Sequence, residues 1–299
     1  MISKANAETA IRKVFPNSRI SAIKRFKKGL VNESYSVSIS SPKKELVLRI
    51  YPKEGWKVEK EAYLYNLIKE KTNVPVPAVY NIDTSKSIIN KPYALLSKIE
   101  GKELPLSKTL VKEAGSCLAK LHSIKFGSFG WIINNQIKPK FKTWPGFILY
   151  DLNYKIKRTK MPGQLAAKIK KYVKINQFLL NIKTKPCLLH KDYHKSHILV
   201  KDGRISGIID FEWSIAGHNE MDIVKSLLWM FNRNKELEKI FLDGYKKYGA
   251  ISDKFNERRR LYELITYLSA LNFAYELKNK RWYDYNLKRI KEALSTWQT

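Results

Sequence analysis

Apolar and polar residues alternate with a period of two in parts of the first hundred residues. The segments SYSVSIS (34–40) and ELVLRI (45–50) show this pattern, and the turn-like SPKK lies between them. In the second segment Leu46, Leu48 and Ile50 fall on one side, as strand residues two apart do. The pattern predicts two neighbouring β-strands with one buried face.

Helical spacing of the apolar residues begins at WKVEKEAYLYNLIKE (56–70). This segment predicts an amphipathic helix that ends before the prolines of VPVP (74–77). The segment YALLSKIEG (93–101) predicts a further strand that runs into a glycine.

After this strand the helical period dominates the rest of the chain. TLVKEAGSCLAKLHSI (109–124) predicts one helix, and further helices are expected at 165–182, 220–248 and 253–295. The order of elements predicts an α+β fold of two lobes. The small lobe, residues 1–98, holds an antiparallel sheet, and the larger lobe, residues 99–299, is mainly helical.

A hairpin is expected inside the stretch LLHKDYHKSHILVKDGRISGIIDFEW (188–213). Two strand-like runs flank Asp202-Gly203, a dipeptide that strongly favours a two-residue hairpin turn. Counting outward from this turn places His197 opposite Ile208 and on the same face as Asp210. These diagonal neighbours are predicted to lie about 7–8 Å apart at Cα, so that their side chains converge.

The polar residues at this end of the hairpin fit phosphoryl transfer. Such a reaction needs a carboxylate that accepts the proton of the acceptor hydroxyl, and ligands for a metal that bridges the phosphates. Asp192, in the loop before the hairpin, is the candidate base, and His197 with Asp210 the candidate metal ligands. The alternative is an ordinary hairpin with solvated polar side chains.

A zinc site is a second alternative, because His190, His194 and His197 could bind zinc together with Asp210. It is disfavoured because His194 and His197 would lie on opposite faces of a strand that begins at residue 194. The sequence also contains no helical His-Glu-x-x-His motif.

The chain is strongly basic, with 57 Lys and Arg, 27 Asp and Glu, and a net charge of +30. Such a charge attracts polyanions. The lysines are scattered from end to end, so RNA is a possible but not a favoured partner. One stretch, residues 138–174, departs from the even scatter with eleven basic residues and one acid, Asp151.

The remaining composition favours a cytoplasmic protein. No apolar run reaches the roughly 18 residues that cross a bilayer, and no export signal is seen, so no membrane partner is expected. Cys117 and Cys187 lie in apolar contexts without Cys-x-x-Cys spacing, which predicts buried, reduced thiols.

Several segments, in the correct order, resemble the aminoglycoside phosphotransferase and choline-kinase-like family, whose fold is protein-kinase-like. HKDYHKSHILV (190–200) resembles its catalytic loop, IIDFEW (208–213) its metal-binding segment, and Asp222 a following structural aspartate. The remaining matches are the nucleotide-covering loop KGLVNESYSV (28–37), the strand LVLRI (46–50), the hinge LLSKIEG (95–101) and the segment LAKLHSI (118–124).

The resemblance implies a role for each matching residue. Asp192 is the catalytic base, Asp210 holds Mg²⁺, and His190 braces the catalytic loop. The nucleotide, ATP or GTP, is implied to contact a set of seven residues: Gly29, Asn32 and Ser34 over the phosphates, Arg49 with its helix partner Glu61, and the backbone of Ser97 and Ile99 at the purine.

Two positions differ from the family's usual loop. Lys191 stands where a glycine is usual, and His197 where most members have asparagine. Mg²⁺ prefers oxygen ligands, and imidazole suits softer metals. The macrolide phosphotransferase branch has a loop of the form His-Gly-Asp-x-x-x-Gly-His-Ile/Val-Leu, which resembles this one at the histidine and implies an active enzyme.

The sequence does not identify the acceptor substrate. The basic stretch argues against a highly cationic acceptor. The last helices carry seven aromatic residues, most of them expected in the core, with Glu263, Glu276 and Asp284 among them; this favours a bulky apolar acceptor with one amine. The hypotheses are a kinase of a macrolide-like or aminoglycoside antibiotic, a kinase of an amino alcohol, sugar or homoserine, and a nucleotide-binding pseudokinase or RNA-associated module. The aromatic set is Tyr262, Tyr267, Phe273, Tyr275, Trp282, Tyr283 and Tyr285.

Overall fold

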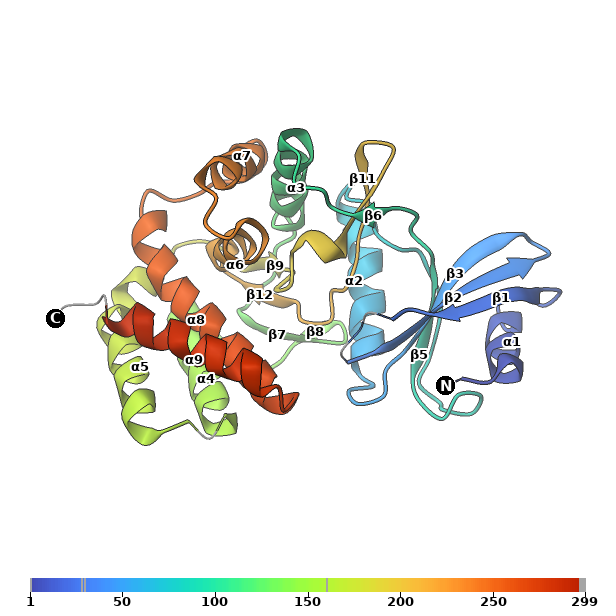
Figure 1. The fold of residues 1–299 in the computed structure, drawn as a ribbon, viewed down its shortest axis with the longest axis horizontal. Coiled ribbons are helices and arrows are strands. Elements are labelled where there is room, and N and C mark those ends of the chain that lie inside the picture. The colour runs from blue at the N-terminus through green and yellow to red at the C-terminus, as the bar shows by residue number, and fades with distance from the viewer. Residues whose placement is uncertain (1, 28, 30, 160, 296–299) are drawn as a thin grey trace.

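The computed structural model describes residues 2–27, 29, 31–159 and 161–295. Five N-terminal strands form an antiparallel sheet in the order β1-β2-β3-β5-β4 (Figure 1). The predicted strands are confirmed as β2 and β3, and the third predicted strand is β5, while β1 and β4 were not predicted. The bounds are β1 (Arg19–Arg25), β2 (Glu33–Ser40), β3 (Lys44–Ile50), β4 (Val79–Asp83) and β5 (Tyr93–Ser97).

Two helices cover the two faces of this sheet. Leu46, Leu48 and Ile50 are buried on one face together with residues of helix α1 (Lys4–Arg12). Helix α2 (Lys57–Lys71), which was predicted at 56–70, packs with Ala94 and Leu96 on the other face. Helix α1 was not predicted, because its buried residues include two alanines, which give a weak helical period.

The C-terminal part is mainly helical and carries two small sheets. The expected helix at 109–124 is α3 (Lys108–Leu121). One sheet has the order β11-β10-β6 and the other β8-β7-β12-β9. The strands are β6 (Lys102–Glu103), β7 (Gly130–Ile133), β8 (Gln136–Ile137), β9 (Cys187–Leu189), β10 (Ile198–Lys201), β11 (Arg204–Ile208) and β12 (Ile215–Gly217).

Each of the three long helices expected here is interrupted. The segment 220–248 breaks where Asn232 and Arg233 adopt positive φ, and the segment 253–295 breaks near Lys278, which also has positive φ. Left-handed residues end a helix, so each break is local. The helices are α4 (Trp144–Arg158), which was not predicted, α5 (Gly163–Ile175), the 3₁₀ turn η1 (Gln177–Leu180), α6 (Asn219–Phe231), α7 (Lys235–Lys246), α8 (Phe255–Glu276) and α9 (Lys280–Ser295).

The hairpin β10–β11 forms with the predicted turn but not with the predicted register. Lys201 pairs with Arg204 as expected. A bulge then follows on β11, so that Ile198, and not His197, lies opposite Ile208. His197 belongs instead to a 3₁₀ turn, η2 (Lys195–His197), and its carbonyl accepts a hydrogen bond from the N–H of Ile209 at 3.0 Å.

The core runs without interruption from α2 and β5 into the helical part. A lobe boundary at residue 98 therefore stays a prediction. Cys117 and Cys187 are buried free thiols, as expected. No helix within the described residues combines the length and apolar character needed to span a membrane.

Candidate active site

The loop between β9 and β10 is held from below by helix α6. Asp222, in the first turn of α6, accepts hydrogen bonds from the N–H groups of His190 at 2.6 Å and Lys191 at 2.8 Å. His122 Nε2 lies 3.4 Å from the same carboxylate. A buried carboxylate thus fixes the start of the loop, which agrees with the structural role implied for Asp222.

His190 braces the same loop, as expected. Its Nδ1 accepts the N–H of Asp192 at 3.2 Å, so Nε2 carries the proton and donates to the carbonyl of Ile209 at 3.0 Å. Burial is the main cause that lowers the pKa of His190 to about 4. The neutral ring joins the loop to the segment before Asp210.

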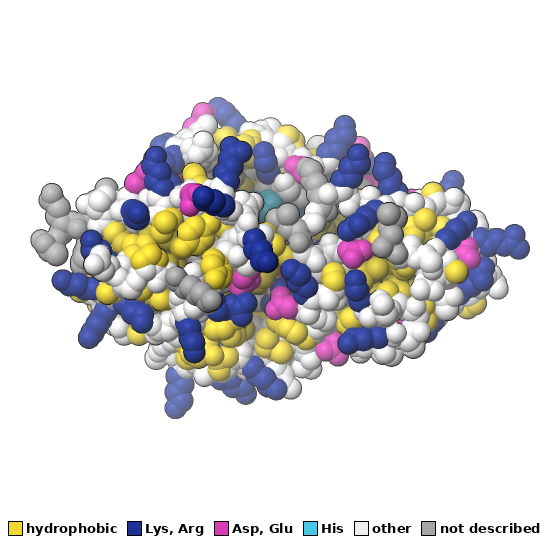
Figure 2. Space-filling view, turned by 60° about the horizontal axis from the view of Figure 1, so that its bottom comes forward, with side chains coloured by type: hydrophobic (Ala, Val, Ile, Leu, Met, Phe, Trp, Pro, Cys, Tyr) yellow, Lys and Arg dark blue, Asp and Glu magenta, His cyan; other side chains and the backbone are white. Residues whose placement is uncertain are grey.

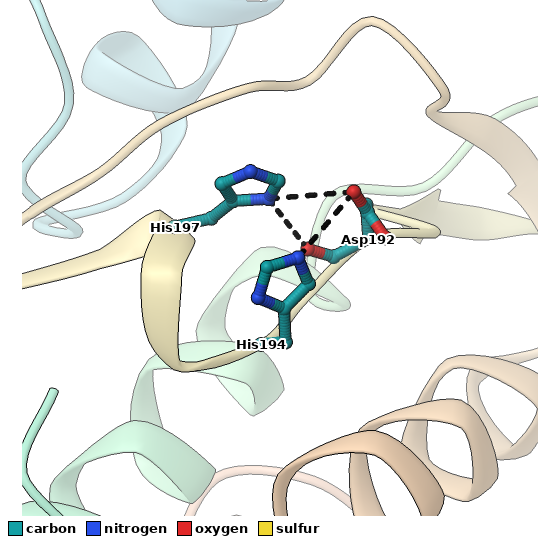
Figure 3. A group of neighbouring side chains, drawn as sticks. All are labelled: Asp192, His194 and His197. Atoms are coloured by element: carbon teal, nitrogen blue, oxygen red, sulfur yellow. Dashed lines mark hydrogen bonds and ion pairs between the residues drawn. The ribbon is translucent and has the colours of Figure 1, made fainter. Parts of the chain in front are cut away.

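The carboxylate of Asp192 has three cationic or hydrogen-bonding neighbours. Lys225 Nζ lies 2.9 Å from one oxygen. His194 Nε2 and His197 Nδ1 lie 3.6 and 3.5 Å from the other (Figure 3). Burial by itself would raise the pKa of Asp192, but Lys225 and then the two histidines hold it well below the usual value. Asp192 is therefore an ionised, oriented hydrogen-bond acceptor.

Lys225 was not found from the sequence. It lies three residues after Asp222 on α6, a spacing that places both side chains on one face of a helix. Its ammonium also bonds to the carbonyl of Lys191. Its helical spacing from Asp222 is the feature of the sequence that could have identified it.

The expected separation of His194 and His197 is wrong. Their rings lie 4.1 Å apart between centroids, because residues 195–197 form a 3₁₀ turn and not a strand. Together with Asp192 they bring three potential ligand atoms within 4.8 Å of one another.

Hydrogen bonds nevertheless identify the protons on these rings. His194 Nδ1 accepts the N–H of Ser196 at 3.2 Å, so the neutral ring carries its proton on the nitrogen that faces Asp192. His197 Nδ1 lies 2.9 Å from the backbone carbonyl of Asp192, an acceptor, and is therefore protonated. Both rings donate toward Asp192, which makes this group a hydrogen-bonded cage around a carboxylate and does not favour zinc there.

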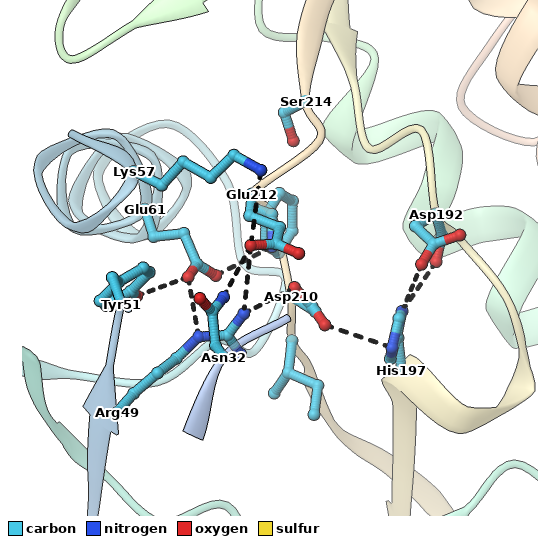
Figure 4. Close-up of polar contacts among 12 residues, drawn as sticks. Asn32, Arg49, Tyr51, Lys57, Glu61, Asp192, His197, Asp210, Glu212 and Ser214 are labelled. Carbon is cyan, nitrogen blue, oxygen red and sulfur yellow. Dashed lines mark hydrogen bonds and ion pairs between the residues drawn. The ribbon is translucent and has the colours of Figure 1, made fainter. Parts of the chain in front are cut away.

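The other nitrogen of His197 meets Asp210 (Figure 4). Nε2 lies 3.4 Å from Asp210 Oδ2, and in the neutral ring it presents a lone pair to that carboxylate. Two electron-rich atoms that face each other form a pair of donor atoms for a cation. The convergence of His197 and Asp210 is thus observed, although the register that predicted it is wrong.

Arg49 joins β3 to both α2 and the segment after β11. Its Nη2 lies 2.9 Å from Asp210 Oδ1 and its Nε 3.1 Å from Glu61 Oε2. Burial opposes its charge, but Asp210 and Glu61 outweigh burial and raise the pKa of Arg49 well above the usual value. Glu61 also accepts the hydroxyl of Tyr51 at 2.5 Å and the N–H of Phe211 at 3.1 Å, so the predicted pair is rigidly held.

A comparison with protein-family models shows the family. The sequence model of the phosphotransferase enzyme family (APH) matches residues 22–264. The chain belongs to the phosphotransferase enzyme family. A search of curated proteins found no match.

Solved structures share the fold at low sequence identity. The aminoglycoside phosphotransferase APH(4)-Ia superposes with a TM-score of 0.76 at 16% identity, covering 99% of this chain and 100% of that one. A fructosamine-3-kinase homologue from Thermobifida fusca gives 0.70 at 18% identity, covering 94% and 98%. APH(2'')-IIa, solved with gentamicin, gives 0.72 at 16% identity, covering 100% and 98%.

This phosphotransferase therefore has the kinase-like α+β fold that the sequence predicts, and the family model identifies it as a phosphotransferase enzyme.

In the segment 28–37, predicted to cover the nucleotide, residues 28 and 30 lie outside the described part of the chain. Gly29 has a φ of 142°, which favours glycine. Asn32 Nδ2 donates to Glu212 Oε2 at 2.7 Å, and Ser34 pairs with Arg49 across β2 and β3.

Glu212 is a second site residue that the sequence reading missed. It is 4% exposed and lies 3.9 Å from Arg49 Nη2 and 3.8 Å from Lys57 Nζ. Burial, followed by the charge of Asp210, raises the pKa of Glu212 to about 7. It follows Asp210 by two residues, and side chains two apart in an extended segment lie on the same face, so this spacing could have identified it.

The segment 95–101, predicted to be the hinge, includes the end of β5 and the residues before β6. The N–H of Ser97 donates to the carbonyl of Ala78 at 2.8 Å, and its hydroxyl accepts the N–H of Ala78 at 2.8 Å. The side chain of Ile99 packs so closely on Gly207 that a Cβ there would lie 2.6 Å from it.

Helices α8 and α9 place part of the aromatic set in the core. Tyr262 and Tyr267 are buried, and Tyr275 and Tyr285 are 38% and 51% exposed. Phe273 lies in edge contact with Trp213 of the metal-binding segment, at 5.5 Å between centroids, and with Trp282, at 5.6 Å. Phe273 is thus the aromatic residue that links these helices to the site.

Proposed function

We propose that this phosphotransferase moves the γ-phosphoryl group of ATP or GTP to a hydroxyl of a small molecule, with Asp192 as the base. One observation carries the proposal. The imidazole of His197 lies between two carboxylates, 3.5 Å from Asp192 on one side and 3.4 Å from Asp210 on the other. Base and metal ligands of a phosphoryl-transfer site would thus be coupled through one ring.

The donor atoms fit a divalent metal ion. Asp210 Oδ2 and His197 Nε2 would hold it, and Arg49 and Glu212 adjust the charge around Asp210. When bound, Mg²⁺ supplies positive charge to the nucleotide phosphates. The nitrogen ligand suits first-row transition ions better than Mg²⁺, so Mn²⁺ is expected to bind as well.

The nucleotide is proposed to lie between the sheet and the hairpin. Arg49, oriented by Glu61, would contact the phosphates beneath the loop that contains Gly29, Asn32 and Ser34. The carbonyl of Ser97 and the N–H of Ile99 would meet the purine, since the Ser97 N–H already bonds to Ala78. A nucleotide analogue and hygromycin B are bound together in a structure of APH(4)-Ia, which supports this assignment by analogy.

The acceptor is proposed to be a small hydroxyl compound, and both antibiotic and metabolic acceptors are consistent with the relatives. Neighbouring structures contain hygromycin B and gentamicin, or are named fructosamine-3-kinases. The loop's likeness to the macrolide branch keeps a macrolide among the candidates. We place the reaction in the cytoplasm, where Cys117 and Cys187 would stay reduced.

A product screen by mass spectrometry tests the proposal. Purified protein would receive Mg²⁺ or Mn²⁺, ATP or GTP, and a panel of macrolides, aminoglycosides, amino alcohols, sugars and hydroxy acids. We expect one panel member to gain the mass of one phosphoryl group while the nucleotide is converted to its diphosphate. Saturable nucleotide binding without any phosphorylated product would favour the pseudokinase alternative.

A further inference from the structure

Lys191, directly before Asp192, has a backbone conformation that side chains with a Cβ rarely adopt. Its φ is 68°, in the left-handed region. Glycine adopts this region freely and is the residue expected at this loop position. Strained conformations persist where the surroundings enforce them, and they cluster at functional sites. A lysine in this conformation therefore suggests a function for its side chain.

The ammonium of Lys191 contacts helix α6. Its hydrogen-bond partner is the sulfur of Met221 on α6, at 3.6 Å, and sulfur is a weak acceptor. The charges that act most strongly on it are Lys155, Lys225 and Asp151, on helices α6 and α4. Within the described part of the chain, no oxygen atom accepts a hydrogen bond from this ammonium.

Other charges on this side of the loop are already paired. Lys155 bonds to Asp151, and also to the hydroxyl of Ser269 at 2.8 Å. Lys225 bonds to Asp192 at 2.9 Å. Lys191, next to Asp192 in the chain, forms no ion pair with a carboxylate among the described residues.

The acids that would bind a cationic acceptor are neutralised as well. Glu263 is paired with Arg259 at 2.9 Å, and Glu276 with Arg158 at 2.8 Å. The amine-binding wall expected from the sequence therefore lacks two of its three acids. Figure 2 shows a histidine in a recess of the surface, on a face over which Lys and Arg side chains are scattered and outnumber Asp and Glu.

We infer that the acceptor carries an anionic group, a carboxylate or a phosphate, which pairs with the ammonium of Lys191 while the acceptor hydroxyl faces Asp192. The inference rests on the proposed function, because it assigns the acceptor of the same site. Burial and the neighbouring lysines lower the pKa of Lys191 to about 7, and a bound anion would favour its charged form. Such an acceptor is a hydroxy acid or a phosphorylated polyol.

Competitive acetylation tests the anion site without requiring turnover. Protein loaded with a non-hydrolysable ATP analogue would be acetylated at constant ionic strength, and the modification of Lys191 measured by peptide mass spectrometry. The ligands are three matched sets: gluconate, glucose and glucamine; glycerate, glycerol and 3-amino-1,2-propanediol; and glycerol 3-phosphate against glycerol. Lys195, exposed on the same loop, is the internal control.

We expect at least one anionic ligand to slow acetylation of Lys191 at least fivefold and saturably, with the neutral and amine analogues and Lys195 unaffected. Protection by gluconate or glycerate would identify the anionic group as a carboxylate, and protection by glycerol 3-phosphate would identify it as a phosphate. Equal labelling with every ligand, or protection by an amine analogue, overturns the inference. Protection of Lys191 without phosphoryl transfer to any ligand would leave the anion site standing and count against the proposed function.

Variants extend the test to turnover. Lys191→Gly keeps the backbone conformation and Lys191→Asn tolerates it, so neither is expected to unfold the loop. Both should lower kcat/KM at least tenfold for the anionic acceptor through a higher KM, and Lys195→Asn should not. An unchanged KM in both Lys191 variants would contradict the inference.

Discussion

At the scale of single residues, the two nitrogens of His197 have different tasks. Nδ1 donates to the backbone of Asp192, and Nε2 faces Asp210 at 3.4 Å. In the proposed site, a neutral ring in this tautomer would orient the base Asp192 on one side and offer a nitrogen ligand to the metal ion on the other. On this proposal, the histidine would make the site more favourable to first-row transition ions than an asparagine would.

His197→Asn should lower the affinity for Mn²⁺ by about tenfold or more in the presence of a nucleotide analogue, because a nitrogen ligand of first-row ions is lost. The affinity for Mg²⁺ should change less. Electron spin echo spectra of bound Mn²⁺ should show coupling to an imidazole nitrogen in the wild type and in His194→Asn. The absence of this coupling in the wild type would contradict the assignment of His197 as a ligand.

Lys225→Met should lower kcat/KM by about tenfold, since a charge-assisted hydrogen bond to Asp192 contributes roughly 1.5–3 kcal/mol. Lys225 is the main cation that lowers the pKa of Asp192, so its removal raises that pKa. The base must be ionised, so the acid limb of the kcat/KM profile should move to higher pH. Lys225→Arg, which keeps the charge, should leave this limb in place; an unmoved limb in Lys225→Met would contradict the pairing.

At the scale of elements, helix α2 brings a buried lysine to the site. Lys60 is 3% exposed, and its ammonium donates to the carbonyl of Glu212 at 2.7 Å. Burial first, and then the charge of Lys57, lowers the pKa of Lys60 to about 7. Lys60 thus anchors helix α2 to the segment that carries Asp210 and Glu212.

This lysine makes stability depend on pH in a defined direction. Its pKa is about 7 when folded and 10.5 in the reference state, so between these values the unfolded chain binds more protons. The free energy of unfolding should then rise with pH by roughly 1.4 kcal/mol per pH unit for this group. Urea unfolding from pH 7.5 to 9.5 measures the slope; Lys60→Met should flatten it, and Lys69→Met, on the exposed side of α2, should not. Equal slopes in both variants would contradict the assignment.

The elements also show what the sequence could and could not predict. The strands β2 and β3 and the helix α2 follow from their periods, because each has one clearly buried face. The bulge on β11 could not be predicted, since it depends on Ser206 bonding to the carbonyl of Glu100, a contact distant in sequence. His197 and Asp210 nevertheless converge as predicted, because the N–H of Ile209 bonds to the carbonyl of His197 and keeps Asp210 in place.

Residues that the resemblance assigned a role converge as expected, whereas Lys225, outside the motifs, and Glu212, within the segment 208–213, were missed. Arg49, Glu61 and Asp210 converge from three elements, which local patterns alone cannot specify. Lys225 and Glu212 were missed although each lies at a simple helical or extended spacing from a recognised aspartate. Their roles depend on tertiary contacts and not on local period.

At the scale of the whole molecule, a net charge of +30 makes electrostatic attraction of anions general and salt-dependent. An RNA-binding module with many phosphate contacts would lose affinity steeply with salt. We expect nucleotide binding near Arg49, whose side chain is 12% exposed, to weaken less than tenfold between 50 and 200 mM salt, because salt screens partly buried charges less than exposed ones. Titration calorimetry with a nucleotide analogue and with single-stranded RNA measures both; a steeper loss for the nucleotide would contradict an enclosed site.

The fold, the family and the geometry around Asp192 together make the identity of the base the central claim. The most direct measurement compares turnover and nucleotide affinity in Asp192→Asn and Asp202→Asn, where Asp202 lies exposed in the hairpin turn with a positive φ that asparagine tolerates. Asp192→Asn should lose about 10²–10⁴ of kcat, the contribution of a general base, and keep its nucleotide affinity. Asp202→Asn should match the wild type in both. Full turnover in Asp192→Asn would contradict the account.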